Sequence, residues 1–148
     1  MAELRRAAFF DLREGVTDSA ALAADAMIRH REAGDLVVHM VHRIEEEPPD
    51  GRPEGAPDLL LYVENDLGHG IGPEVRSPFG ARLGAVVEFM ARLGLSPTRC
   101  FGYGDHLDAA GMLCVVGNPR VLGQDPEIIE YARERGWPTS GDSTIGIS

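Results

Sequence analysis

Two carboxylates in this 148-residue chain stand where an enzyme of the α/β class would use them. Asp11 follows the apolar run 7–10, and Asp105 follows the predicted strand 99–103 and Gly104. Parallel strands buried on both faces have such apolar sequences, and open α/β sheets bind ligands beside the carboxyl ends of their strands. Carboxylates at that edge could move protons or hold a cation. The alternative for Asp11 is an ordinary turn residue after a buried strand.

Imidazole and guanidinium groups are expected at the same edge. An imidazole exchanges protons near neutral pH, whereas a guanidinium holds an anion without exchanging protons. Together with carboxylates they suit general acid–base chemistry, in which an arginine binds a carboxylate or stabilises an enolate-like anion. The candidate catalytic residues are Asp11, Arg13, His42, Asp105 and His106, and the candidate substrate-binding residues are Arg82 and Asp108.

Structural roles also explain several of these residues. Asp11 and Arg13 could form an ion pair that stabilises an inactive site, and Asp108 could cap or line a short helix. His39 is expected to be a packed or hydrogen-bonded core residue. His30 is expected to be solvated.

The elements that position these residues alternate between strand and helix. Strands are predicted over 7–10, 36–41, 59–63, 99–103 and 120–122, and helices over 20–33, 82–93, 107–116 and 125–135. This alternation with short links predicts a three-layer α/β/α sandwich with a mostly parallel five-stranded sheet. Residues 1–138 are expected to form a single domain, followed by a flexible C-terminal tail over 139–148.

Two stretches interrupt the alternation. The Pro- and Glu-rich stretch 43–58 is expected to be a loop, although a covering helix would normally join two parallel strands there. The Gly- and Pro-rich stretch 66–80 is also expected to be a loop. Sheet surface near 43–58 should therefore be thinly covered, which makes it a possible contact between copies of the chain in a homo-oligomer.

The net charge of −10 argues against a nucleic-acid backbone as the partner. No apolar run is long enough to span a bilayer, and residues 1–6 do not resemble a signal peptide. Cys100 and Cys114 lie in apolar surroundings and are expected to be packed, reduced thiols. These features predict a cytoplasmic protein with no nucleic-acid or membrane partner.

Two motifs resemble those of haloacid-dehalogenase-like (HAD) phosphatases. The block Phe101–Leu113 looks like the fourth motif of that family, and Ala7–Asp18 resembles the first motif. The continuation Val116–Pro138 is similar to the phosphoserine-phosphatase-like branch. The resemblance implies a HAD-like Rossmannoid core in which Asp11 matches the nucleophile and Asp105 matches the metal-binding aspartate.

Other motif positions depart from the family pattern. Arg13 stands at the general-acid position, and a permanently charged guanidinium cannot exchange a proton near neutral pH. Val41–His42 replaces the phosphate-binding Ser or Thr of the second motif, Arg82 aligns with the lysine of the third, and Ala109 stands at the second acidic position of the fourth. There is also no room for the family's cap before the second strand. A capless HAD-like fold without conventional phosphatase activity is therefore expected.

The resemblance would build a magnesium site from Asp11, Asp105 and the backbone carbonyl of residue 13. Arg13 would place a positive charge near that ion or pair with one of the carboxylates, and either arrangement weakens metal binding. We therefore expect no cofactor, with magnesium bound weakly if at all.

Three functions remain open at this point. The first is metal-independent acid–base chemistry on a small organic substrate: cyclisation, isomerisation, elimination or hydrolysis. The second is a residual magnesium-dependent phosphatase with Asp11 as nucleophile, and the third is a non-catalytic pseudoenzyme or partner-binding module. The first is favoured because ionisable groups, rather than inert ones, replace the phosphatase residues. The Ala-, Gly- and Arg-rich composition points to bacterial specialised metabolism.

Overall fold

The computed structural model describes residues 6–13, 17–44, 57–64, 75–77 and 82–139. Within these ranges only the backbone is described for residues 17–18, 41–44, 57–60, 62 and 75–77. The elements are β1 (Ala7–Asp11), α1 (Thr17–Glu32), β2 (Leu36–Ile44), β3 (Pro57–Val63), β4 (Val75–Ser77), α2 (Arg82–Leu93), the 3₁₀ helix η2 (Pro97–Arg99), β5 (Phe101–Gly104), the 3₁₀ helix η3 (Leu107–Ala109), α3 (Ala110–Leu113), β6 (Asn118–Val121) and α4 (Pro126–Arg135).

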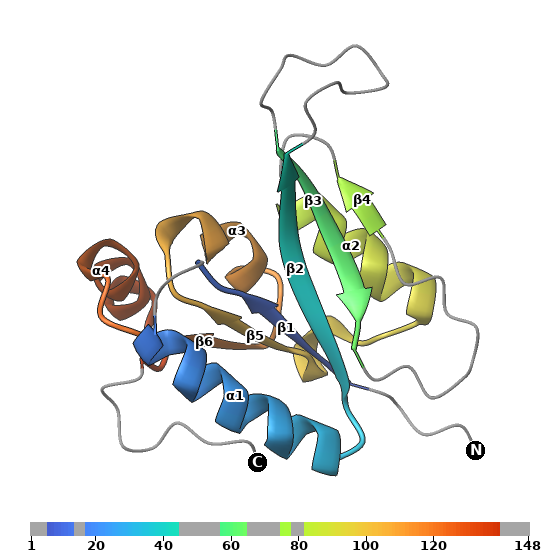
Figure 1. Cartoon of the computed structure of the whole chain (residues 1–148), viewed down its shortest axis with the longest axis horizontal. Helices are drawn as coiled ribbons and strands as arrows, with labels where there is room; N and C mark the ends of the chain where they lie inside the picture. Colours follow the sequence, from blue (N-terminus) through green and yellow to red (C-terminus); the bar gives the residue numbers. More distant parts are fainter. Residues whose placement is uncertain (1–5, 14–16, 45–56, 65–74, 78–81, 140–148) are drawn as a thin grey trace.

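The fold is α/β with a parallel sheet at its centre, as the strand–helix alternation predicts (Figure 1). The strand order is β4-β3-β2-β1-β5-β6. Strands β2, β1, β5 and β6 run parallel to one another, while β3 pairs antiparallel with β2 and β4 antiparallel with β3. The ends of β1 and β5 therefore meet at one edge of the sheet.

The β2–β3 pair differs from the predicted connection. Ile44 lies opposite Pro57, so both ends of the expected 43–58 loop are strand. Antiparallel neighbours need no crossover helix, which explains why the sequence offers none there. β4 lies inside the stretch 66–80 that was expected to be a loop, so the described sheet has six strands rather than five. The rest of both stretches lies outside the described residues.

Two apolar clusters occupy opposite faces of the sheet, which is compatible with a layered sandwich. One cluster lies under α1, and the other lies under α2, α3 and α4 (Figure 1). Alternate residues of β1 divide between them: Ala8 and Phe10 face α1, whereas Ala7 and Phe9 face the other helices. This period of two is the one that a strand buried on both faces requires.

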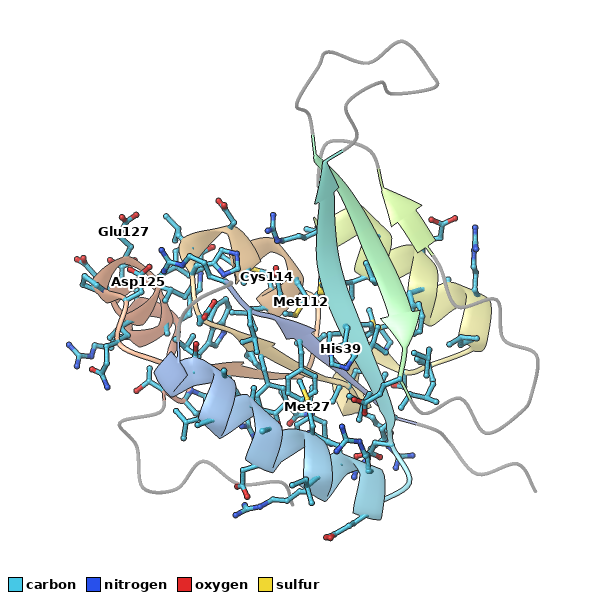
Figure 2. All side chains as sticks on the ribbon, viewed as in Figure 1. Met27, His39, Met112, Cys114, Asp125 and Glu127 are labelled. Carbon is cyan, nitrogen blue, oxygen red and sulfur yellow. The ribbon has the colours of Figure 1, made fainter. Side chains whose placement is uncertain are left out.

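Helix α4 begins and ends where its local sequence predicts. The Asp125 carboxylate accepts a hydrogen bond of 3.0 Å from the backbone N–H of Glu127, and Pro126 occupies the first helical position. Figure 2 labels Asp125 and Glu127 at this end of the helix. Gly136 ends the helix with a left-handed φ of 72°.

A buried hydrogen-bonded network lies beneath α1, and His30 is at its centre. His30 is fully buried, with Nδ1 2.8 Å from Asp35 Oδ2 and Nε2 2.7 Å from the Tyr103 hydroxyl. Arg6 donates two further hydrogen bonds to Asp35, at 2.9 and 3.0 Å. The prediction that His30 is solvated is therefore wrong. The turn after α1 brings Asp35 to the imidazole and supplies the partner that burial requires.

Acidification below about pH 6.5 is expected to reduce stability through His30. Burial lowers the pKa of His30 below its ordinary value of 6.5, although the neighbouring Asp35 opposes the shift. The unfolded chain then binds a proton that the folded chain does not, so stability falls by up to about 1.4 kcal/mol per pH unit as pH decreases. Urea unfolding between about pH 7.5 and pH 5 measures the slope. His30→Gln should flatten it, while His39→Gln should not; equal slopes in the two variants would contradict the assignment.

His39 and the cysteines have different surroundings from those expected. His39 is only partly buried, and its Nε2 lies 3.3 Å from Glu64 on the surface. Cys100 is buried, but Cys114 is exposed, so the prediction of two packed thiols holds only for the first. Both are free cysteines.

The described surface has scattered apolar side chains, and they lie on helices. The exposed large ones are Leu22, Ile28, Leu83, Val87 and Leu107. The side chains at the β2–β3 end near 43–58, where contact between copies was expected, lie outside the description. Among the described residues, no helix has both the length and the apolar character needed to cross a bilayer.

Candidate active site

Asp11 and Asp105 meet at the carboxyl edge of the sheet. Asp11 is the last residue of β1, Asp105 follows β5 directly, and the parallel register places Asp11 beside Gly104. Both side chains are about as buried as a core residue, with 1% of their surface exposed. Two parallel neighbours thus deliver their carboxylates to one buried place.

Gly104 lets η3 pack closely against the end of β5. A Cβ atom at this position would lie 2.5 Å from the Cβ of Ala109, which is closer than real side chains approach. The absent side chain allows η3 to pack directly on the end of β5, and His106 immediately precedes η3. The imidazole is therefore held over the strand ends.

Asp105 is a carboxylate with several hydrogen-bond donors. Its Oδ1 accepts from the backbone N–H of Arg13 at 2.8 Å and lies 2.9 Å from His106 Nδ1, while Oδ2 accepts from the Ser19 hydroxyl at 2.7 Å. Burial opposes ionisation of Asp105, but the hydrogen bonds from His106, Ser19 and Arg13 outweigh it and lower its pKa below the ordinary value. Asp105 is thus held as a carboxylate.

The surroundings of His106 define its tautomer. Arg82 Nη2 lies 3.4 Å from His106 Nε2, and a guanidinium can only donate, so Nε2 is the acceptor. The proton of the neutral ring is then on Nδ1, where it is donated to Asp105. The arrangement is an Asp–His pair with the basic nitrogen directed away from the aspartate.

Asp11 has one paired oxygen and one unpaired oxygen. Oδ2 accepts a hydrogen bond from Nε of Arg82, the first residue of α2. Oδ1 is buried and has no hydrogen-bond partner among the described residues. His106 Nε2 lies 3.8 Å from it across the site. A buried carboxylate oxygen without a donor is costly, and such atoms in native sites call for a ligand or another specific explanation.

The Arg13 guanidinium does not pair with Asp11 or Asp105. It donates to Asp125 at 2.6 Å and is half exposed, so the side chain ties the end of β1 to the start of α4. Only its backbone N–H reaches the candidate site, through Asp105. The alternative in which the Arg13 side chain pairs with Asp11 or Asp105 is therefore not observed; Arg82 pairs with Asp11 instead.

Comparison with family models, curated proteins and solved structures finds no match to this chain.

The structure locates two further candidates, His42 and Asp108, only by their positions on β2 and η3. His42 is on β2, opposite Leu59 of β3. It lies three residues beyond His39, which pairs with Phe10 near the end of β1. Its side chain lies outside the description. Asp108 is exposed in the first turn of η3. Neither is shown in contact with the Asp11–His106 pair.

Ser19 and Asp125 contribute to the site although sequence analysis did not assign them to it. In the sequence, a serine in the first turn of α1 and an acid before Pro126 indicate only where two helices begin. Their contacts with Asp105 and Arg13 join residues 86 and 112 positions apart. No local pattern carries that information.

The magnesium site implied by the HAD resemblance does not fit these residues. The Arg82 guanidinium binds Asp11, and both Asp105 oxygens already accept hydrogen bonds. A cation could reach the unpaired Oδ1 of Asp11 only beside this permanent positive charge, and at Asp105 it would have to compete with the hydrogen-bond donors. Within the described part of the chain, no three His, Cys, Asp or Glu side chains gather as a potential metal site.

Asp105→Asn is expected to keep the His106 tautomer while weakening the network. The Arg13 backbone N–H requires an acceptor at the Oδ1 position, so the amide oxygen should occupy it and the NH₂ should face Ser19. Exchanging charged for neutral hydrogen bonds should cost about 1–3 kcal/mol of stability. Side-chain ¹⁵N NMR reports the tautomer and urea unfolding reports the stability, with Asp25→Asn on exposed α1 as the matched control. A proton found on Nε2 of the neutral ring would contradict the assignment.

Proposed function

We propose that this chain is an enzyme that performs metal-independent acid–base chemistry on a small organic substrate. We also propose that its fold is a capless HAD-like core of the phosphoserine-phosphatase-like branch. The observation that carries the activity is the Asp105–His106 pair, whose basic Nε2 lies 3.8 Å from the unpaired Oδ1 of Asp11.

His106 acts as the general base in this proposal. Asp105 accepts the Nδ1 proton, which orients the ring and favours the imidazolium that forms when Nε2 takes a proton. The Ser19 hydroxyl and the Arg13 backbone N–H hold Asp105 from two other directions. Such an aspartate is restrained in the position that general-base catalysis requires.

Arg82 is the electrostatic group. Its guanidinium lies 3.4 Å from His106 Nε2, so negative charge that develops next to the base also develops next to Arg82. The side chain is 13% exposed, as is His106, so both connect the buried carboxylates with the surface. A substrate carboxylate or an enolate-like anion suits such a group.

The same geometry supports the proposed ancestry. Arg82, aligned with the lysine of the third HAD motif, contacts Asp11, aligned with the nucleophile of the first. The order of strands around β1 and β5 puts Asp105 beside them. We also propose a cytoplasmic setting in bacterial specialised metabolism, which the Ala-, Gly- and Arg-rich composition favours.

A substrate screen in D₂O tests the activity. The full chain, with a chelator present, is incubated with small keto, hydroxy and ester-bearing organic acids, and ¹H NMR detects any product or deuterium incorporation. The double variant Asp11→Asn/His106→Gln is the blank, and His39→Gln is a control with one histidine fewer outside the site. Conversion or exchange that exceeds the blank supports the proposal. No conversion anywhere in the panel, or equal rates in the blank, contradicts it and favours a non-catalytic binding module.

The residual phosphatase is tested separately with p-nitrophenyl phosphate and magnesium. We expect no turnover above the blank. Magnesium-dependent turnover that Asp11→Asn abolishes would replace the present proposal with the phosphatase.

A further inference from the structure

Arg82 makes two contacts of unequal strength in the candidate site. Its Nε donates to Asp11 Oδ2 in a buried pair of opposite charges, whereas its Nη2 lies 3.4 Å from His106 Nε2. Hydrogen bonds between charged partners are the stronger kind, and 3.4 Å is at the long end of hydrogen-bond distances. Of these two contacts, the one with His106 is therefore the easier to break.

This weaker contact covers the atom that the proposed reaction needs. A neutral imidazole has one lone pair in the plane of the ring, and in His106 it is on Nε2, where the Arg82 N–H occupies it. A proton taken up at Nε2 would also place two positive charges 3.4 Å apart. His106 can therefore act as a base only after Nη2 of Arg82 has moved away.

The other neighbours of His106 favour its charged form. Asp105 Oδ1 lies 2.9 Å from Nδ1, and Asp11 Oδ1 lies 3.8 Å from Nε2. Carboxylates on two sides of an imidazole stabilise the imidazolium. Arg82 is thus the group that opposes proton uptake, in a site whose carboxylates favour it.

We infer that Arg82 keeps His106 inactive until an anionic group of the substrate draws Nη2 away from Nε2. The inference rests on the proposed function and names its substrate class, which is small organic acids with a carboxylate near the proton to be removed. The carboxylate accepts from Nη2 and neutralises the guanidinium, while Nε stays with Asp11. The substrate C–H bond then breaks, its proton binds Nε2 and its electron pair stays on the substrate. Return of a proton from Nε2 to the substrate restores the neutral ring.

The exposure and charge of the site favour a carboxylate over other anions. Arg82 and His106 are 13% exposed, whereas Asp11 and Asp105 are 1% exposed, so the guanidinium is more accessible than the carboxylates behind it. With a neutral His106, the two carboxylates outnumber the one guanidinium, and this excess negative charge repels a phosphate dianion more than a monoanion. A planar carboxylate also matches the geometry of a guanidinium.

Side-chain ¹⁵N NMR of the full chain tests the contact without any substrate. The probe is sodium acetate at a fixed pH of about 8, where an ordinary histidine is neutral. Sodium chloride controls for ionic strength, and acetamide is a neutral ligand of the same shape. We expect acetate, and neither control, to move the His106 Nε2 resonance saturably toward that of a lone pair without a donor. The His39 resonances should not move.

Arg82→Lys is the matched variant. Its ammonium keeps a positive charge for Asp11 but lacks the planar fork that reaches two acceptors. Without acetate, the His106 Nε2 resonance of the variant should already lie where acetate brings that of the wild type, and acetate should move it no further. If Arg82→Lys does not fold, the wild-type titration decides alone. A wild-type resonance that acetate does not move, or an unchanged resonance in folded Arg82→Lys, would overturn the inference.

The D₂O screen separates this inference from the proposed function. Each acid of the panel is paired with its neutral primary amide. We expect exchange above the blank to be at least about 10-fold faster for the acid, because a hydrogen bond to a charged group contributes at least that factor. Equal rates for acids and amides would contradict the inference and leave the acid–base proposal standing. No exchange with any compound would contradict the proposed function instead, and the acetate titration would still decide whether a carboxylate displaces Arg82.

Discussion

Replacement of His106 by glutamine is expected to lower the turnover number of the proposed reaction by about 10²- to 10⁴-fold. Glutamine retains much of the volume of the ring but cannot accept and release a proton near neutral pH. The His106 side chain is largely buried, with 13% of its surface exposed, and it donates to Asp105, so its loss should also cost about 1–3 kcal/mol of stability. The decisive comparison is the turnover number against the urea midpoint of the same variant.

His39→Gln is the matched control for this experiment. It removes the same kind of side chain from β2, where the imidazole contacts Glu64 instead of the candidate site. We expect wild-type turnover from it. If both variants lose activity equally, or if His106→Gln retains most of the wild-type rate, His106 is not the general base.

Asp35→Ala is expected to be the most destabilising of the substitutions considered, at about 3–5 kcal/mol. The carboxylate is 3% exposed and accepts from both Arg6 and His30. Its removal leaves a guanidinium and a fully buried imidazole without their shared acceptor. Against a typical total stability of about 5–15 kcal/mol this is a large fraction. Chemical denaturation measures it directly.

Asp25→Ala provides the comparison on the same helix. Asp25 pairs with Arg29 at 3.2 Å in an exposed i, i+4 arrangement, so its loss should cost less than about 0.5 kcal/mol. A loss below about 1 kcal/mol for Asp35→Ala would mean that the buried network contributes far less than its burial indicates.

Local patterns in the sequence were sufficient for most elements. The bounds of α2 and the capped start of α4 agree with the structure, because the apolar period, Asp125, Pro126 and Gly136 act within a few residues of each helix end. The position of each carboxylate at the end of a strand, Asp11 in β1 and Asp105 after β5, also agrees with the structure. These features depend on interactions within one turn or one strand.

Strand direction and strand number needed the tertiary structure. The apolar sequence of 36–41 predicts a buried strand but not the direction of its neighbours. No local pattern predicts that β3 pairs antiparallel with it. β4 has three residues between glycine- and proline-rich sequence, too few to show a period of two. Sheet pairing decides both, and it joins residues distant in the chain.

The sequence alone determined which groups could do chemistry and the edge where they would meet; the tertiary structure decided which of them touch. In the sequence Arg13 could pair with Asp11, only two residues away, but in the structure its guanidinium binds Asp125 and Arg82 pairs with Asp11. His30 reads as a solvated helix residue, yet it is buried against Asp35 and Tyr103. A charged side chain takes the partner that packing brings within reach, and packing is set by contacts across the whole chain.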